Sequence, residues 1–483
     1  MTILQDKEPR LVWKHFEEIS KIPRCSKHEE KIRGYVIDFA RKQGLKYKTD
    51  KAGNIVVTKP ALSKNMENKP ILILQSHMDM VCEKNSDVDH DFSKDPLKLK
   101  LDGDTLSADG TTLGADDGIG VSIALAMLED KNIRNGPIEA LFTVDEETGL
   151  TGAFAIRSDF LEGRTMINLD SEEFGVLTVG CAGGGESRIE LPLKYKIIPK
   201  NTPGLNIKIT GLKGGHSGVN IKEQRGNAIK ILTRLLWRAS EHYKFMLSEI
   251  YGGDKHNAIP REAFATVAIN KKEIEDFSSF LKREMNDIAE EIKPIDPDCT
   301  MLIEPNSKIK KVYDTSLQDK LLLLLYSLPH GVIKMSYDIP GLVETSTNLA
   351  VVSIKGKKIQ ILMSSRSAVK TELDDIRARI RAIAKLAKAD VTEDKPYPGW
   401  KPNMNSKLLA LCRKVYKEMY KEEVKVEAVH AGLECGIIGE KFPGMDMISI
   451  GPTIRYLHSP NEQVSISSVK KLYDYTVRIA ESL

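Results

Sequence analysis

The sequence has few of the features that mark secreted and membrane proteins. Its 483 residues include six cysteines, scattered without a CxxC pair, so we expect reduced thiols rather than a disulfide framework. The first residues, MTILQDKEPRLVWKHF, do not show the charged and then apolar pattern of a signal peptide. No apolar run approaches the roughly 18 residues of a membrane span. These absences predict a cytoplasmic protein without a membrane partner.

A strong charge imbalance is also missing. The chain carries 71 basic and 68 acidic residues, for a formal net charge of +3. Lysine-rich runs such as IKGKKIQ lack any basic motif around them, so we interpret them as solvated surface and expect no nucleic-acid partner. A hydrophobic content of 41% and a charged content of 29% are typical of a globular protein. The length predicts two or three domains.

The first part of the chain alternates between predicted strands and helices. We expect helices over 9–19 and about 27–43, the second capped by Ser26, two strands around the turn at Ala52–Asn54, and a strand over 71–76. A polar loop to about residue 115 and an apolar helix in DGIGVSIALAMLED follow. The strands in PIEALFTVDEETG and TMINLDSEE both end in carboxylates. This alternation predicts an α/β sheet with functional groups beyond the strand ends.

The pattern changes near residue 187. From there to about 396, two successive stretches share a β-α-β-β-α layout, and no acidic clusters stand at their strand ends. After the proline-rich KPYPGWKPN the α/β pattern returns. We therefore predict a discontinuous catalytic domain, residues 1–186 and 397–483, with a mixed sheet flanked by helices. An α+β domain, residues 187–396, is inserted into it.

Ionisable side chains gather at element ends in the first and last parts of the chain. They are His77 and Asp79, Asp116 and Asp117, Glu146 and Glu147, Asp170, and His458. Each alone also fits a structural role, since a lone histidine is often a core residue and paired aspartates often cap a helix. Together, two histidines and three carboxylates are the ligand types that hold two zinc-like ions, and a neighbouring carboxylate supplies a general base.

Five motifs occur in an order that resembles a known family. SHMDMV, GADDGIG, VDEETG, NLDSEE and LHSPNE follow one another as in the aminoacylase/carnosinase-type co-catalytic zinc exopeptidases. Within that family the chain is most similar to the aminoacyl-histidine dipeptidase (Xaa-His dipeptidase, peptidase D) group, over essentially its whole length. The resemblance implies a metallopeptidase whose inserted domain serves as a lid.

The resemblance also implies a role for each clustered residue. It assigns the metal ligands as follows: His77 and Asp170 for one zinc, Glu147 and His458 for the other, and Asp116 between them. Asp79, on the same strand face as His77, would orient that histidine, and Glu146 would be the general base. Relatives often carry asparagine after the bridging acid. Because this chain has Asp117 there, the choice of bridging aspartate stays open.

A second set of candidates lies outside these clusters. By resemblance, His216 in GLKGGHSG would stabilise the oxyanion and Asn257 in HNAIP would contact the substrate. Arg366 in MSSRS would bind the substrate's terminal carboxylate. Glu434 in GLECG would meet a free α-amine, although a structural role fits it equally well. The sequence leaves open whether His216 acts within its own chain or across a dimer.

We therefore expect metal-dependent hydrolysis of unblocked dipeptides, including Xaa-His substrates such as β-alanyl-histidine. Two divalent ions are implied, with zinc expected and manganese or cobalt also suited to these ligands. We expect a homodimer whose partner in the reaction is a small peptide. The alternatives are an N-acyl-amino-acid amidohydrolase or tripeptidase on the same fold, or a non-catalytic binding protein.

Overall fold

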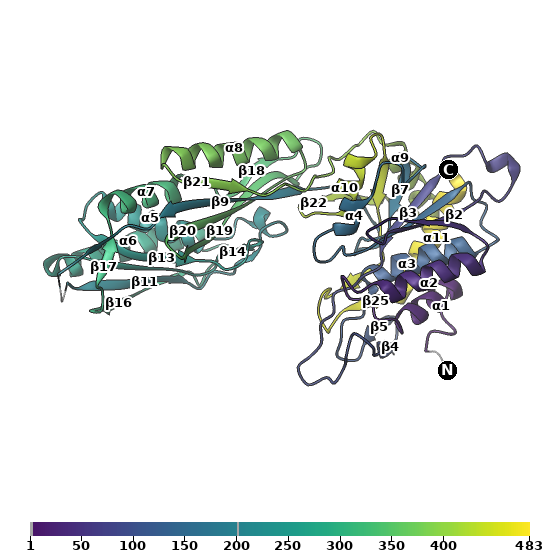
Figure 1. Cartoon of the computed structure of the whole chain (residues 1–483), viewed down its shortest axis with the longest axis horizontal. Helices are drawn as coiled ribbons and strands as arrows, with labels where there is room; N and C mark the ends of the chain where they lie inside the picture. The colour runs from purple at the N-terminus through teal and green to yellow at the C-terminus, as the bar shows by residue number, and fades with distance from the viewer. Residues whose placement is uncertain (1–2, 200–201) are drawn as a thin grey trace. The chain divides into compact units, whose positions relative to one another are not determined.

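The chain divides into two compact units. The computed structural model describes residues 3–199 and 202–483 (Figure 1). Unit 1 comprises Met1–Cys181, Trp400–Ala428 and Leu433–Leu483, and unit 2 comprises Ala182–Gly399 and Val429–Gly432. The predicted divisions at 186/187 and 396/397 lie near the two main crossings. The short return at 429–432 was not predicted.

Unit 1 is built on an eight-stranded mixed sheet in the order β1-β2-β6-β3-β7-β23-β8-β22. Its central strands β6, β3, β7 and β23 run parallel, which brings their carboxyl ends to one edge. The bounds of these strands are β1 (Lys46–Thr49), β2 (Ile55–Lys59), β3 (Leu72–His77), β6 (Ile138–Thr143), β7 (Thr165–Asn168), β8 (Val176–Cys181), β22 (Lys425–Val429) and β23 (Asp446–Ser449).

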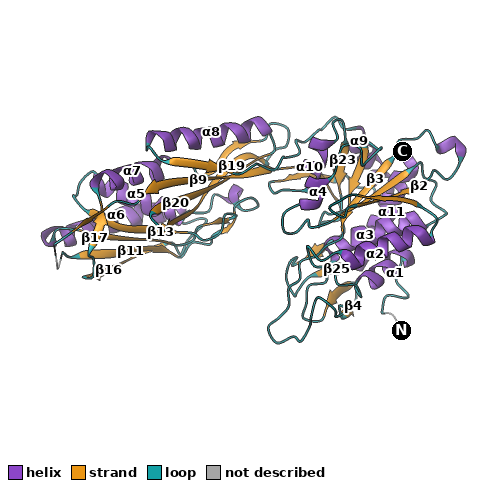
Figure 2. Cartoon of the chain, in the orientation of Figure 1, coloured by secondary structure: helices purple, strands orange, loops and turns teal. Residues whose placement is uncertain are grey.

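Helices flank this sheet (Figure 2). They are α1 (Arg10–Ile19), α2 (Glu30–Lys42), α3 (Ala115–Glu129), α4 (Thr151–Ala155), α9 (Lys407–Tyr420), α10 (Glu434–Lys441) and α11 (Ile466–Ser482), with a 3-10 turn at Lys64–Met66. The apolar helix α3 packs on β3 and against α1. Ile73 of β3 instead joins Ile438 and Phe442 of the α10 region in a separate apolar cluster. Alternate residues of β3 therefore face opposite layers.

A four-stranded sheet in unit 1 corrects one prediction. The segment expected to be a polar loop up to residue 115 contains the hairpin β4 (Leu99–Asp102) and β5 (Thr105–Ala108). β5 pairs with β25 (Gln463–Ser465), which pairs with β24 (Ile454–Arg455). Because the partner of β5 lies far along the chain, the short local pattern did not reveal the sheet.

Unit 2 contains a nine-stranded sheet in the order β16-β11-β15-β13-β19-β20-β9-β21, with β18 paired to β19. Helices α5–α8 contact one another and pack on these strands over one large apolar core. The helices are α5 (Ala228–Ser240), α6 (Ile274–Ile292), α7 (Thr315–Ser327) and α8 (Lys370–Leu386), with 3-10 turns at Ile221–Glu223 and Lys271–Glu273.

The strands of unit 2 follow the predicted double layout and add to it. Their bounds are β9 (Gly183–Pro192), β10 (Tyr195–Ile197), β11 (Gly204–Thr210), β12 (Gly215–His216), β13 (Met246–Gly252), β14 (Ala258–Ile259), β15 (Ala263–Ala268), β16 (Thr300–Asn306), β17 (Lys311–Tyr313), β18 (Gly331–Met335), β19 (Val343–Lys355), β20 (Lys358–Ser367) and β21 (Asp390–Glu393). The pairs β10–β17 and β12–β14 stand outside the large sheet. Within the described ranges, no helix has the length and apolar character needed to cross a membrane.

The expectation that all cysteines are reduced is wrong for one pair. Cys25 and Cys82 form a disulfide, while Cys181, Cys299, Cys412 and Cys435 are free and buried. The pairing is a tertiary effect, because Cys25 and Met80 lie side by side in a parallel β-bridge. Because Cys25 and Cys82 are 57 residues apart in the sequence, no local pattern indicated that they pair.

We expect thiol titration of the unreduced protein in denaturant to detect only the four free cysteines. Addition of a reductant before the titration should raise the count to all six. Closing a loop of this length also stabilises the folded chain by about 4 kcal/mol, so reduction should lower the free energy of unfolding. Six reactive thiols without reductant would contradict the disulfide.

Candidate functional site

The ends of the parallel strands bring the predicted polar residues together in unit 1. In the sheet register, His77 at the end of β3 lies opposite Thr143 at the end of β6, and Gln75 lies opposite Asn168 at the end of β7. The acidic runs that follow β6 and β7 therefore start beside His77. Their meeting follows from the parallel sheet rather than from closeness in the chain.

The first cluster contains His77, Asp116 and Asp170. The Nε2 atom of His77 lies 3.0 Å from Oδ1 of Asp116 and 3.4 Å from Oδ1 of Asp170. Burial disfavours a charged ring, yet Asp170 and the other carboxylates raise the pKa of His77 well above its ordinary value. Burial also raises the pKa of Asp170 to about 8. A buried imidazole between two carboxylates is a suitable place for a divalent cation.

The second cluster contains Asp116, Glu147 and His458. The Nε2 atom of His458 lies 3.2 Å from Oδ2 of Asp116 and 3.1 Å from Oε2 of Glu147. Hydrogen bonds to Asp116 and Glu147 raise the pKa of His458 to about 11. The buried Oε1 of Glu147 has no hydrogen-bond partner among the described residues.

Asp116 belongs to both clusters, and Asp117 belongs to neither. Asp116 faces His77 with one carboxylate oxygen and His458 with the other. Asp117 is instead occupied by backbone, since Oδ2 accepts from His77 N at 3.2 Å and Oδ1 accepts from Gly120 N at 3.2 Å. The donor set of nitrogen and carboxylate oxygen fits two divalent ions that share one carboxylate.

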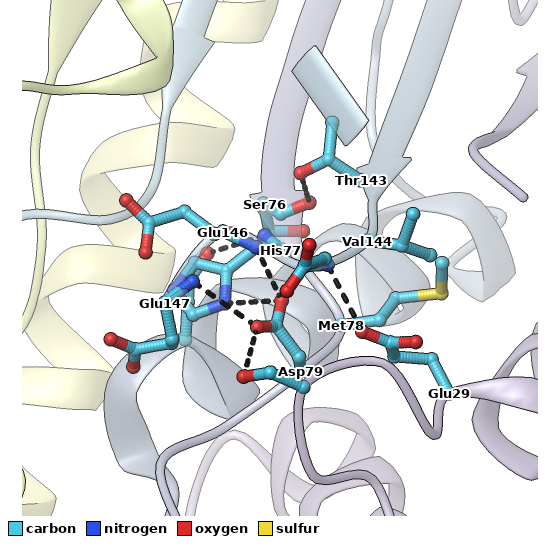
Figure 3. Close-up of polar contacts among 12 residues, drawn as sticks. Glu29, Ser76, His77, Met78, Asp79, Thr143, Val144, Glu146 and Glu147 are labelled. Atoms are coloured by element: carbon cyan, nitrogen blue, oxygen red, sulfur yellow. Dashed lines mark hydrogen bonds and ion pairs between the residues drawn. The ribbon is translucent and has the colours of Figure 1, made fainter. Parts of the chain in front are cut away.

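Asp79 lies behind His77 and holds several donors at once (Figure 3). Its Oδ1 lies 3.3 Å from Nδ1 of His77 and accepts a hydrogen bond from the backbone N–H of Glu146, and its Oδ2 accepts one from the backbone N–H of Glu147. Ser26 Oγ donates to it at 2.8 Å. Burial opposes ionisation, but hydrogen bonds, first that from His77, lower the pKa of Asp79 to about 2. An ionised Asp79 fixes the ring orientation of His77.

Ser26 does not have the role predicted from the sequence. The helix expected from about residue 27 begins at Glu30, and its N-cap residue is Glu29. Ser26 does not cap the helix because its hydroxyl donates to Asp79, which lies just beyond the end of β3 and 53 residues further along the chain. The serine is therefore part of the support of His77, a role that no local motif indicates.

Glu146 lies beside the two clusters described above without belonging to either. Ligand atoms of His77, Glu146 and Glu147 lie within 4.8 Å of one another. In Figure 3 the Glu146 carboxylate points away from Asp79. Burial raises the pKa of Glu146 well above its ordinary value. A carboxyl group with a raised pKa next to cation ligands is suited to proton transfer.

The candidates from the inserted region lie together in unit 2. β12 pairs with β14, with His216 opposite Ala258, and Ser217 N donates to the carbonyl of Asn257 at 2.8 Å. Arg366, on β20, is 7% exposed, and its Nη1 donates to the Tyr397 hydroxyl at 3.0 Å.

The charge of Arg366 affects the ionisation of His216. Burial and then the nearby charge of Arg366 lower the pKa of His216, which favours the neutral imidazole. No hydrogen-bond partner of Arg366 Nε is found in the described part of the chain. A buried guanidinium with spare donors is an anion-binding feature.

Glu434 is fully buried at the start of α10. Gln75 Nε2 and Thr143 Oγ1 each donate to its Oε2 at 2.7 Å, and burial raises its pKa to about 7. Its Oε1 finds no partner within the described residues. The predicted contact with a substrate amine stays a prediction, because an amine would have to enter the protein interior to reach this carboxyl group.

We expect Glu434→Gln to change how stability depends on pH. The folded pKa of Glu434 is about 7 and its ordinary value is 4.5, so the folded state retains the proton longer than the unfolded state does. The contribution of this proton is present below the unfolded pKa and lost as pH rises through the folded pKa, about 3 kcal/mol in all. Glutamine does not titrate, so the stability of the variant does not fall with pH at this position. Urea unfolding of both metal-free proteins at pH 5 and pH 8 should show the difference, whereas identical pH dependence would contradict the assignment.

The fold and the two clusters define the class of protein, and a family model agrees with both. The model of peptidase family M20/M25/M40 matches residues 73–482. The chain belongs to this family, and it is a metallopeptidase. The predictions of a mixed α/β peptidase fold and of a metallopeptidase are thereby confirmed.

Named relatives are consistent with this assignment. The chain is 39% identical to the cytosol non-specific dipeptidase of Escherichia coli K12 over 469 residues. This alignment covers 97% of this chain and 96% of the E. coli protein. The chain is also similar to the crystal structure of aminoacylhistidine dipeptidase from Vibrio alginolyticus, with a TM-score of 0.95 and 38% identity over 100% of this chain and 98% of the other. Aminopeptidase PepT from Bacillus cereus, at 17% identity and a TM-score of 0.57, covers 98% of both chains and shares the fold.

Proposed function

We propose that this metallopeptidase hydrolyses unblocked dipeptides, including Xaa-His dipeptides such as β-alanyl-histidine. The main support for this proposal is that the carboxylate of Asp116 belongs to both clusters, since one of its oxygens faces His77 and the other faces His458. His77 and Asp170 would hold one divalent ion, and Glu147 and His458 the other. Zinc is the expected metal, and manganese and cobalt suit the same ligands. The names of the E. coli and V. alginolyticus relatives support dipeptides as the substrates.

The two ions, when bound, polarise the scissile carbonyl and make water more acidic. Glu146 takes the proton from the attacking water and delivers it to the leaving amine. Burial raises the pKa of this carboxyl group, so its ionised form binds a proton more strongly than an ordinary glutamate does, which suits the group that takes the proton from water. Asp79 keeps the ring of His77 in one orientation throughout the reaction.

Unit 2 would act as the lid, as the resemblance of the chain to the aminoacyl-histidine dipeptidase group implies. Arg366 binds the terminal carboxylate of the dipeptide, a role supported by its burial and its spare donors. His216 donates to the developing oxyanion, and Asn257, adjacent to the His216 turn, contacts the substrate. Glu434 is retained as a candidate for the free amine, as predicted from its motif.

We also propose a cytoplasmic homodimer. The cytoplasmic location is supported by the name of the E. coli relative and by the sequence composition. The Cys25–Cys82 disulfide points in the other direction, since stable disulfides are rare in reducing compartments. The thiol titration described above is therefore also relevant to location.

The test compares hydrolysis of β-alanyl-histidine with hydrolysis of N-acetyl-histidine by the purified protein. We expect cleavage of the free-amine dipeptide alone, abolished by a chelator and restored by zinc or manganese. Cleavage of the acetylated compound would indicate an amidohydrolase, and preferential cleavage of tripeptides would indicate a tripeptidase. If none of these substrates is cleaved and no metal binds, the alternative of a non-catalytic binding protein holds.

A further inference from the structure

A buried carboxylate outside the predicted site binds the backbone at the start of α3, where Asp116 lies. Glu462 is 2% exposed and follows His458 by four residues in LHSPNE. Its Oε2 accepts hydrogen bonds from Leu113 N at 2.8 Å and from Gly114 N at 2.9 Å. Its Oε1 accepts from Ala115 N at 2.8 Å and from Asp116 N at 3.3 Å. One side chain thus binds the consecutive backbone N–H groups that lead to Asp116.

Among the residues that the structure describes, no other acceptor is found for these N–H groups. They lie at the start of α3, where the first backbone donors of a helix lack intrahelical partners. Gly114, the N-cap residue, has a φ of 65° and no side-chain cap, and Asp116 has non-helical dihedral angles. Asp116 therefore lacks the regular helical geometry of the rest of α3, and its backbone N–H donates to Glu462 instead of to a helical partner.

A buried cation completes the frame. Arg24 is 1% exposed, and its Nη2 donates to the carbonyl of Gly114. Its Nη1 donates to the carbonyls of Met78 at 3.2 Å and Asp79 at 3.0 Å. Burial lowers the pKa of Arg24, and Glu462 is the charge that opposes this most strongly. The two buried charges therefore fix opposite sides of the peptides before Asp116, and Arg24 links them to the end of β3.

We propose that Glu462 is a positioning residue that couples two metal ligands from distant parts of the chain, Asp116 and His458. Glu462 and His458 share one short loop, so binding the backbone before Asp116 sets the position of His458 relative to that carboxylate. Since Asp116 belongs to both clusters, loss of this coupling weakens both metal sites. The inference rests on the proposed function, because it requires that these residues bind metal.

The test is metal binding by Glu462→Gln, with Glu139→Gln as the matched control. Glu139 is also 2% exposed and also accepts backbone N–H groups, from Glu162 at 3.0 and 3.2 Å and from Gly163 at 2.9 Å. It lies opposite Ile73, whereas His77 lies opposite Thr143, so it is about 13 Å from the strand ends that form the site. The control therefore reproduces the loss of a buried acceptor without touching the start of α3.

The amide of Glu462→Gln retains one acceptor oxygen and turns a donor toward the remaining N–H groups. We expect zinc affinity, measured by competition with a chromophoric chelator, to fall about 10–100-fold, as for other residues that support ligands. Glu139→Gln should lower the free energy of unfolding of the metal-free protein and leave zinc affinity unchanged. Glu462→Asp, which keeps the charge but shortens its reach, serves if the glutamine variant does not fold and should also bind zinc more weakly.

Two results would overturn the coupling role. One is zinc affinity of a folded Glu462 variant equal to that of the unmodified protein. The other is an equal loss of affinity in Glu139→Gln, which would reduce the effect to general destabilisation. If the unmodified protein binds no zinc, manganese or cobalt, the proposed function fails and this inference fails with it. Strong binding by the unmodified protein together with an unchanged Glu462 variant refutes the inference alone.

Discussion

Replacement of Asp116 by asparagine is expected to remove both metal ions and to lower kcat/KM for dipeptide hydrolysis more than about 10³-fold, the equivalent of several kcal/mol. The effect is large because both clusters use this carboxylate, Oδ1 toward His77 and Oδ2 toward His458. An amide oxygen is a weaker ligand and is uncharged, so neither ion retains its shared anionic donor. Metal content of the dialysed variant, measured together with its activity, checks the prediction.

Asp117→Asn is the matched control for this experiment. Asp117 accepts from the backbone of His77 and Gly120 and takes no part in either cluster. The asparagine variant should retain both ions, with a cost in stability because a buried acceptor is altered. If Asp117→Asn lost the metals and Asp116→Asn kept them, the bridging role would belong to Asp117. The choice that the sequence left open is decided by these two variants.

Glu146→Gln should lower kcat by about 10²–10⁴-fold, the usual contribution of a general base, while metal content and KM change little. Glutamine has nearly the shape of glutamate but takes no proton from water. Residual activity should also lose the acidic limb of the pH profile that protonation of Glu146 produces. Loss of metal in this variant would instead make Glu146 a ligand, and unchanged kcat would exclude it as the base.

Local patterns in the sequence predicted much of unit 1 and the five residues that gather in the two clusters. The apolar run before His77, the apolar segment after Asp117 and the acids after two further strands identify β3, α3, β6 and β7 with little ambiguity. Parallel strands end at one edge, so residues that follow them meet without any further information. Five ordered motifs then gave the family, which the family model confirms.

What the sequence did not reveal depends on contacts between distant segments. The bond from Ser26 to Asp79 spans 53 residues, and the bond from Glu462 to Leu113 spans 349. The β4–β5 hairpin pairs with β25 near the end of the chain, and Cys25 reaches Cys82 only after folding. Ser26, Cys25 and Cys82 have no local pattern that distinguishes them from a surface serine or a free thiol, and the LHSPNE motif does not show which backbone groups Glu462 binds. Such supporting contacts become visible only when the tertiary structure is known.

The central claim is that hydrolysis requires two ions held around Asp116. Its most direct test is titration of the metal-free protein with zinc, following the rate of β-alanyl-histidine cleavage at each addition. We expect no cleavage without metal and a rate that rises until two equivalents are bound, with no further rise beyond them. Full activity after exhaustive chelation, or a plateau at one equivalent with no second ion bound, would contradict it.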